Sequence, residues 1–99
     1  MSQGVVARRY AKALIQLADH QNTLELTGEY LLEISDSIQS SPELQASLTS
    51  NKVSFVIKQE ILGQVLRRIE SPLLVRTFSL YLLAKRRIEL LPTISTAFE

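Results

Sequence analysis

The sequence predicts an all-helical protein, a compact bundle of six helices in a single domain. Only three glycines and three prolines interrupt its 99 residues. It contains no Asn-Gly or Asp-Gly dipeptide, which would be typical of a β-hairpin, and no long alternation of apolar and polar residues. Apolar residues recur instead at spacings of three and four, the periodicity of an amphipathic helix. With 45% hydrophobic residues, the chain can bury a core.

The predicted helices follow from this periodicity and from residues that start helices. Their approximate ranges are 4–20, 22–39, 41–48, 52–69, 72–86 and 89–99. Asn22, with Glu25 three residues later, has the pattern of a capping box. Serine followed by proline predicts helix starts at Ser41 and Ser71. Ser54 is a further candidate cap, within a frayed start of the fourth helix.

Gly28 weakens the second helix by about 1 kcal/mol relative to alanine. In the later helices, apolar stripes predict the sides that face the core. The fourth helix has apolar residues spaced by four, with two more beside them: Ile57, Ile61, Val65 and Ile69, then Leu62 and Leu66. The sixth has Pro92 in its first turn, and its apolar side is formed by Ile94, Ala97 and Phe98.

The first helix has more apolar surface than one core contact requires. At about 100° per residue, its apolar residues cover an arc of roughly 200°, whereas a surface helix needs about 100°. One edge of this arc is formed by Val6, Tyr10, Ala13 and Leu17. The other edge is mostly small, and is formed by Ala7, Ala11, Leu14, Ile15 and Ala18. This helix must therefore contact other protein on two sides.

The fifth helix is apolar around most of its circumference, so it is the expected neighbour of the first. Its apolar residues are Leu73, Leu74, Val75, Phe78, Leu80, Tyr81, Leu82, Leu83 and Ala84. From the residues alone, two interpretations are equally open. The two helices form a buried central pair, or they line a groove that accepts an amphipathic helix from a partner.

The residues that metal sites and enzymes require are scarce. There is no cysteine, and the only histidine, His20, lies at a predicted helix end where it would be solvated or act as a cap. Asp19 and His20 point about 100° apart on a helix, so they do not form a catalytic relay. The three glycines are isolated, so no phosphate-binding loop is expected. We expect no enzyme, no metal and no cofactor.

Three basic clusters keep one alternative open, a small helical nucleic-acid-binding domain. The clusters are Arg8-Arg9, Arg67-Arg68 and Lys85-Arg86-Arg87. The last two lie at predicted helix C-termini, where cations interact favourably with the helix dipole, and the net charge is only +1. A self-associating bundle, joined through the first and fifth helices, is another alternative. No apolar run approaches the roughly 18 residues of a membrane span.

Three blocks of sequence carry a family resemblance. Val6–Ala18 contains Arg-Tyr-Ala followed by Ala-Leu and a later alanine, and Ser71–Ile94 contains a Phe- and Leu-rich helix, a basic turn and Leu-Pro. Ser40–Ser54 is a softer match. Together they resemble the N-terminal domain of the delta subunit of ATP synthases, the family of the mitochondrial oligomycin-sensitivity-conferring protein. The stretch from Lys85 to Ile88 is most similar to cyanobacterial and chloroplast forms.

The resemblance implies a non-catalytic stator component of a rotary proton-translocating ATP synthase. In this family the matching region is a six-helix domain on the catalytic head, and it binds the N-terminal helix of an alpha subunit between its first and fifth helices. The b subunits of the peripheral stalk bind a second, C-terminal domain, which these 99 residues lack. We therefore expect a piece of a longer protein, monomeric when isolated and peripheral on the cytoplasmic, stromal or matrix side of an energy-transducing membrane.

Transferred by position, the resemblance also assigns the sides of the two helices. Ala7, Ala11, Leu14 and Ala18 would pack inward, and Phe78 and Leu82 would lie in the core. The groove for the alpha subunit would be lined by Val6, Tyr10, Ala13, Leu17, Leu74, Thr77, Tyr81 and Lys85.

Overall fold

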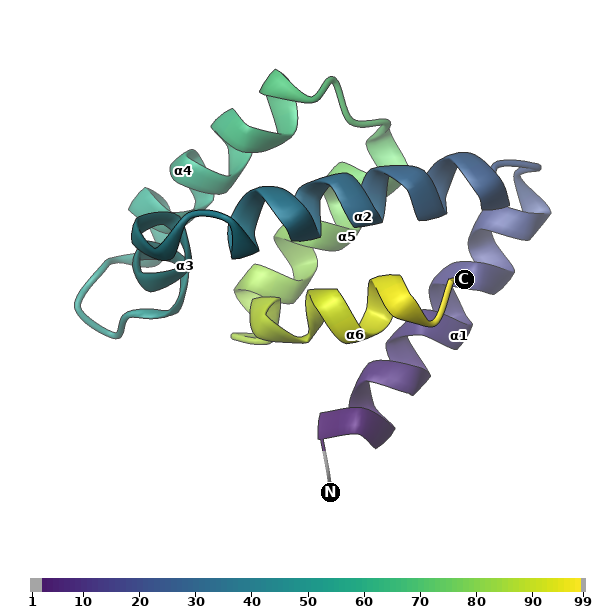
Figure 1. Ribbon diagram of the computed structural model, residues 1–99, viewed down its shortest axis with the longest axis horizontal. Helices are drawn as coiled ribbons and strands as arrows, with labels where there is room; N and C mark the ends of the chain where they lie inside the picture. The colour runs from purple at the N-terminus through teal and green to yellow at the C-terminus, as the bar shows by residue number, and fades with distance from the viewer. Residues whose placement is uncertain (1–2, 99) are drawn as a thin grey trace.

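Helices account for most of the computed structural model, which describes residues 3–98 (Figure 1). In chain order the elements are α1 (Gln3–His20), α2 (Leu24–Gln39), α3 (Pro42–Thr49), α4 (Phe55–Arg68), α5 (Leu73–Ala84), the short 3₁₀ helix η1 (Ile88–Leu90) and α6 (Leu91–Thr96). No strand occurs within residues 3–98. The prediction of an all-helical fold with six helices is confirmed. The Cα radius of gyration is 12.7 Å, close to the ~13 Å typical of a compact chain of this length.

Two helices begin at serine caps. The Ser41 hydroxyl accepts a hydrogen bond from the Leu44 N–H at 3.2 Å, and proline follows in the first helical position, as predicted. The Ser54 hydroxyl accepts from the Ile57 N–H at 3.3 Å. Because this cap fixes the start of α4, the helix begins at Phe55, three residues later than predicted.

Three helices end in the same backbone motif, in which a residue with positive φ stops the helix. These residues are Asn22 (58°), Glu70 (55°) and Arg86 (58°). In each case this residue and the next donate their N–H groups to carbonyls three and five positions back, the Schellman arrangement. The capping box predicted at Asn22 is therefore wrong. Asparagine tolerates the left-handed conformation, so it ends α1, and α2 begins at Leu24.

The ends of α5 and α6 also differ from the prediction. Pro72, not Ser71, occupies the N-cap position of α5, because the Ser71 N–H completes the motif that ends α4. α5 stops at Ala84 since Arg86 adopts positive φ. The predicted 89–99 helix is divided into η1 and a shorter α6, with Pro92 in its first turn as expected. Glu99 lies outside the described residues.

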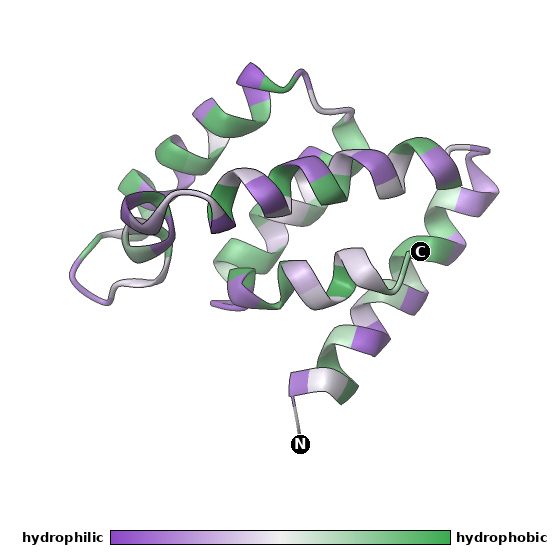
Figure 2. Cartoon of the chain, in the orientation of Figure 1, coloured by the Kyte–Doolittle hydropathy of each residue, from purple (hydrophilic) through white to green (hydrophobic). Residues whose placement is uncertain are grey.

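The core forms where the amphipathic stripes of the helices converge. Figure 2 shows hydrophilic and hydrophobic bands along the long helices, and the buried side of each follows its hydrophobic band. α2 and α6 lie side by side across the front of the view in Figure 1, and α5 passes behind α2. α1 packs against α6 and α2 through its small-residue edge. That edge is buried as predicted: Ala7, Ala11, Leu14 and Ala18.

Two predictions about core positions need correction. Ile57 is 51% exposed because the first turn of α4 extends past the core, which α4 reaches through Leu62 and Leu66. Phe78 is only half-buried, whereas Leu82 lies in the core as expected. Within residues 3–98 no helix combines the length and apolar character needed to cross a membrane.

Candidate helix-binding groove

An apolar groove lies between α1 and α5 and encloses about 350 Å³. We call it the α1–α5 groove. Its lining is formed by Tyr10, Ala13, Leu14 and Leu17 from α1 and by Leu74, Thr77, Phe78 and Tyr81 from α5. On both helices these positions follow the spacing i, i+3, i+4, i+7, so each helix contributes one continuous face. Such a face on each wall is suited to a third helix lying between them.

The structure brings together most of the residues that the resemblance assigned to a groove. Six of the eight line it: Tyr10, Ala13, Leu17, Leu74, Thr77 and Tyr81. Val6 is half-buried against the core instead, one turn before the groove begins. Lys85 lies beyond the last lining residue of α5, and its ammonium group is 5.6 Å from the centre of the Tyr81 ring.

Sequence reasoning missed Leu14 and Phe78. Leu14 is buried, as predicted, yet its side chain also reaches the groove. Phe78 was placed in the core and is half-buried at the wall of the groove. Both residues follow a predicted lining residue by four positions, Tyr10 and Leu74, but this spacing does not show that a residue contacts the core and the groove at once.

An aromatic cluster forms one end of the groove. The Tyr10 ring meets the Phe78 ring edge-on, with centroids 6.3 Å apart and planes at 70°. It meets the Tyr81 ring in the same manner, at 6.1 Å and 68°. Edge-to-face pairs are the favoured geometry for aromatic side chains. Tyr10 therefore joins the two walls and holds its position before any ligand is bound.

Two cations lie at this aromatic end. Arg87 donates a hydrogen bond from Nη1 to the Tyr10 hydroxyl oxygen at 2.5 Å, and its guanidinium lies 5.6 Å from the Tyr10 ring centre. Lys85 stacks on Tyr81 as described above. Both contacts belong to the cation–π class. The opposite end, at Leu17 and Leu74, carries no such contact in the described part of the chain.

The exposure of the groove residues shows that this surface is incompletely covered. Leu17 is 52% exposed and Tyr81 is 47% exposed. Isolated exposed apolar residues are ordinary on a protein surface, but here they line one concave strip. A ligand with an apolar face would remove this strip from water.

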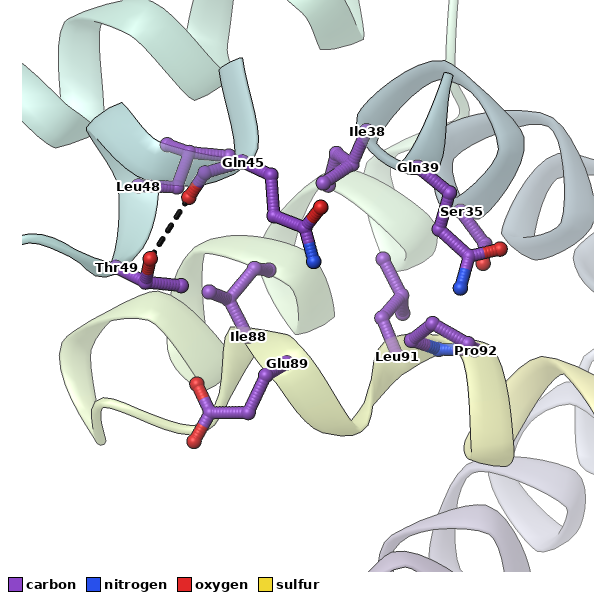
Figure 3. A pocket seen from close by; sticks show the side chains of 10 residues that line it. All are labelled: Ser35, Ile38, Gln39, Gln45, Leu48, Thr49, Ile88, Glu89, Leu91 and Pro92. Carbon is purple, nitrogen blue, oxygen red and sulfur yellow. Dashed lines mark hydrogen bonds between the residues drawn. The ribbon is translucent and has the colours of Figure 1, made fainter. Parts of the chain in front are cut away.

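A second concavity lies between α2, α3 and the segment that contains η1 and α6 (Figure 3). Ile38, Leu48, Ile88 and Leu91 converge on it from these elements. It holds about 30 Å³, which is room for roughly one water molecule. Within residues 3–98 no group of three or more His, Asp or Glu side chains is arranged so that it could hold a metal ion.

Comparison with known proteins identifies the family. Residues 6–99 match the family described as ATP synthase delta (OSCP) subunit. The ATP synthase delta subunits of Chlorobaculum parvum and Trichlorobacter lovleyi are 35% and 30% identical to this chain over 98 and 99 residues. That of Bacillus mycoides is 32% identical over 98 residues.

These alignments cover 99–100% of the chain but only 53–55% of each relative. The chain thus spans about half the length of the relatives that it matches. The family is one of non-catalytic structural subunits, in agreement with the scarcity of catalytic residues in the sequence. The chain belongs to the ATP synthase delta (OSCP) subunit family.

Proposed function

We propose that this chain is the head-binding part of an ATP synthase delta subunit, and that its α1–α5 groove binds the N-terminal helix of an alpha subunit. The observation that carries the proposal is the pair of apolar faces on α1 and α5, each with lining residues at i, i+3, i+4 and i+7. An amphipathic helix with anchors at the same spacing would fill the space between them.

The proposed role is static. The chain would help to hold the catalytic head to the peripheral stalk while the rotor turns, and it would lie peripherally on the cytoplasmic, stromal or matrix side of the membrane. Contact with the b subunits would require the part of the relatives that these residues do not span. A particular likeness to cyanobacterial and chloroplast forms rests on the stretch from Lys85 to Ile88 alone, and the relatives named above do not support it.

Affinity in this groove would come from desolvating apolar side chains that are already in place. The exposed parts of Leu17 and Tyr81 would be covered by the bound helix. Truncation of a well-packed interface tyrosine costs on the order of 2 kcal/mol of binding free energy. Tyr10 is held by Phe78, Tyr81 and Arg87, so little side-chain entropy would be lost when a helix binds.

Calorimetry with a synthetic peptide covering the N-terminal helix of the cognate alpha subunit tests the proposal. We expect one peptide to bind per chain with a micromolar or lower Kd. Ala13→Asp should abolish binding, because it places a carboxylate in the apolar groove. The helical circular dichroism should not change, because Ala13 is exposed.

Ala46→Asp is the matched control, since Ala46 is an exposed alanine on α3, outside the groove. It should leave peptide binding unchanged. Two results would contradict the proposal: no heat of binding at micromolar peptide, or an equal loss of binding in the two variants. Unfolding of Ala13→Asp would place Ala13 in the core and remove it from the groove.

A further inference from the structure

We propose that another groove, between α2 and α6 and distinct from the cavity in Figure 3, docks a basic amphipathic segment of a partner protein. It encloses about 460 Å³, and we call it the acidic groove because of the carboxylates on its rim. Its apolar floor is formed by Leu24, Gly28 and Leu32 of α2 together with Phe98, and its rim carries Glu25 and Glu29. It shares no lining residue with the α1–α5 groove.

The floor is an uncovered apolar strip. Leu24 and Leu32 are 40% and 46% exposed, and they lie two turns apart on the same side of α2. Gly28 lies between them and has no side chain, which leaves a hollow bounded by the half-buried Phe98 ring. A Cβ atom at Gly28 would lie 3.4 Å from the Phe98 Cδ2 atom, so any larger side chain would begin to fill this hollow.

The negative charge of α2 indicates that the partner segment is basic. The helix contains four acidic residues and neither lysine nor arginine: Glu25, Glu29, Glu33 and Asp36. At about 100° per residue these carboxylates share an arc of roughly 80°, directly beside the apolar line of the floor. They extend about 16 Å along the helix axis. All four are exposed, and none forms an ion pair within residues 3–98.

An apolar line flanked by a row of unpaired carboxylates is complementary to one kind of segment. Such a segment is a helix with leucine-like anchors on one side and lysine or arginine along the neighbouring edge. The α1–α5 groove has the opposite polarity, because its charged neighbours are Lys85 and Arg87. The two grooves therefore select different partners, and the occupant of the acidic groove is not the helix proposed for the first.

Two designed peptides test this inference on the 99-residue chain. One helical peptide carries leucine anchors at i, i+4 and i+7 with lysines on the adjacent edge, and the other replaces each lysine with glutamate. Fluorescence anisotropy should show binding of the lysine peptide only, with an affinity that falls as the salt concentration rises. Leu32→Ser should weaken binding by about tenfold or more.

Leu26→Ser is the matched control, because Leu26 is 44% exposed on the same helix but does not line the groove. It should change the affinity by less than about twofold. The double variant Glu25→Lys/Glu29→Lys should reverse the preference to the glutamate peptide, whereas Glu60→Lys, on α4, should not. Ala13→Asp should have no effect, which separates this site from the α1–α5 groove.

Three outcomes would overturn the inference. The first is equal binding of the lysine and glutamate peptides. The second is an equal loss of affinity in Leu26→Ser and Leu32→Ser. The third is dimerisation of the chain that Leu32→Ser abolishes in sedimentation, because a second copy would then be the occupant.

Discussion

Ser79 carries a hydroxyl that the fold leaves without a partner. The residue is fully buried in α5, and its Oγ atom has no hydrogen-bond partner within residues 3–98. An unpaired buried hydroxyl costs about 1–3 kcal/mol of stability. We expect Ser79→Ala to raise the free energy of unfolding by at least about 1 kcal/mol, and the melting temperature by roughly 4–8 °C.

Thermal denaturation followed by circular dichroism measures this change. Ser37→Ala on α2 is the control, because its hydroxyl is satisfied by the Glu33 carbonyl at 2.8 Å. This control gains only the helix propensity of alanine, about 0.5 kcal/mol. If Ser79→Ala stabilised the chain no more than Ser37→Ala, the buried hydroxyl would have to be satisfied in solution.

At the scale of a helix, the residue that ends α4 has a strained backbone conformation that glycine would adopt at lower cost. Glu70 adopts a φ of 55°, a left-handed conformation that costs a residue with a Cβ atom about 1–2 kcal/mol. Its carboxylate also lies at a helix C-terminus, where negative charge is unfavourable. Glu70→Gly should therefore raise the free energy of unfolding by about 1 kcal/mol in urea denaturation.

Asn22→Gly provides the comparison at the end of α1. Asparagine visits the left-handed region more readily than glutamate does, so this change should gain only a few tenths of a kcal/mol. Equal gains in the two variants would show that relief of backbone strain at Glu70 is not the cause.

The ends of these helices also show what could and could not be predicted about the helices from the sequence. Periodicity predicted their number, because burial of an apolar face dominates helix stability. It showed that α1 has two apolar edges, and the family resemblance predicted which of them is buried. The predicted end of α1, His20, is confirmed, and the predicted ends of α4 and α5 lie one and two residues too late. The positive-φ motif that ends these helices was not predicted. Helix-stopping positions are usually marked by glycine, and here Asn22, Glu70 and Arg86 occupy them. Asn22 was misleading because asparagine is also a preferred N-cap.

The lining of the α1–α5 groove was partly predictable for a related reason. Positions in the middle of a stripe, such as Ala13 and Thr77, can face only one way. Leu14 and Phe78 lie on the boundary between the core and the groove, and they contact both. A helical wheel assigns such a residue to one side, so only the packing of neighbouring helices shows its second contact. That this surface binds a helix stays a prediction.

For the whole molecule, we predict a monomer of 11.2 kDa in solution. Its exposed large apolar residues are spread over the surface: two line each groove, and Leu26, Phe55, Val56, Ile57 and Leu73 line neither. The α1–α5 groove is lined by only eight residues. Stable interfaces use about 20–30 residues on each side. Sedimentation equilibrium across a range of concentrations measures the mass. A dimer that Ala13→Asp dissociates would favour self-association through α1 and α5 over a free groove.

The hydrogen bond between Arg87 and Tyr10 joins residues 77 positions apart, and this separation has a consequence for biosynthesis. α1 is translated first, but the opposite wall of its groove is formed by α5. Arg87, which donates the hydrogen bond to Tyr10, lies in the turn beyond α5. At roughly 5–20 residues per second, a ribosome needs several seconds to make the intervening chain. During that interval the apolar surface of α1 is present and the groove is not. A ligand that requires both walls therefore discriminates finished chains from nascent ones.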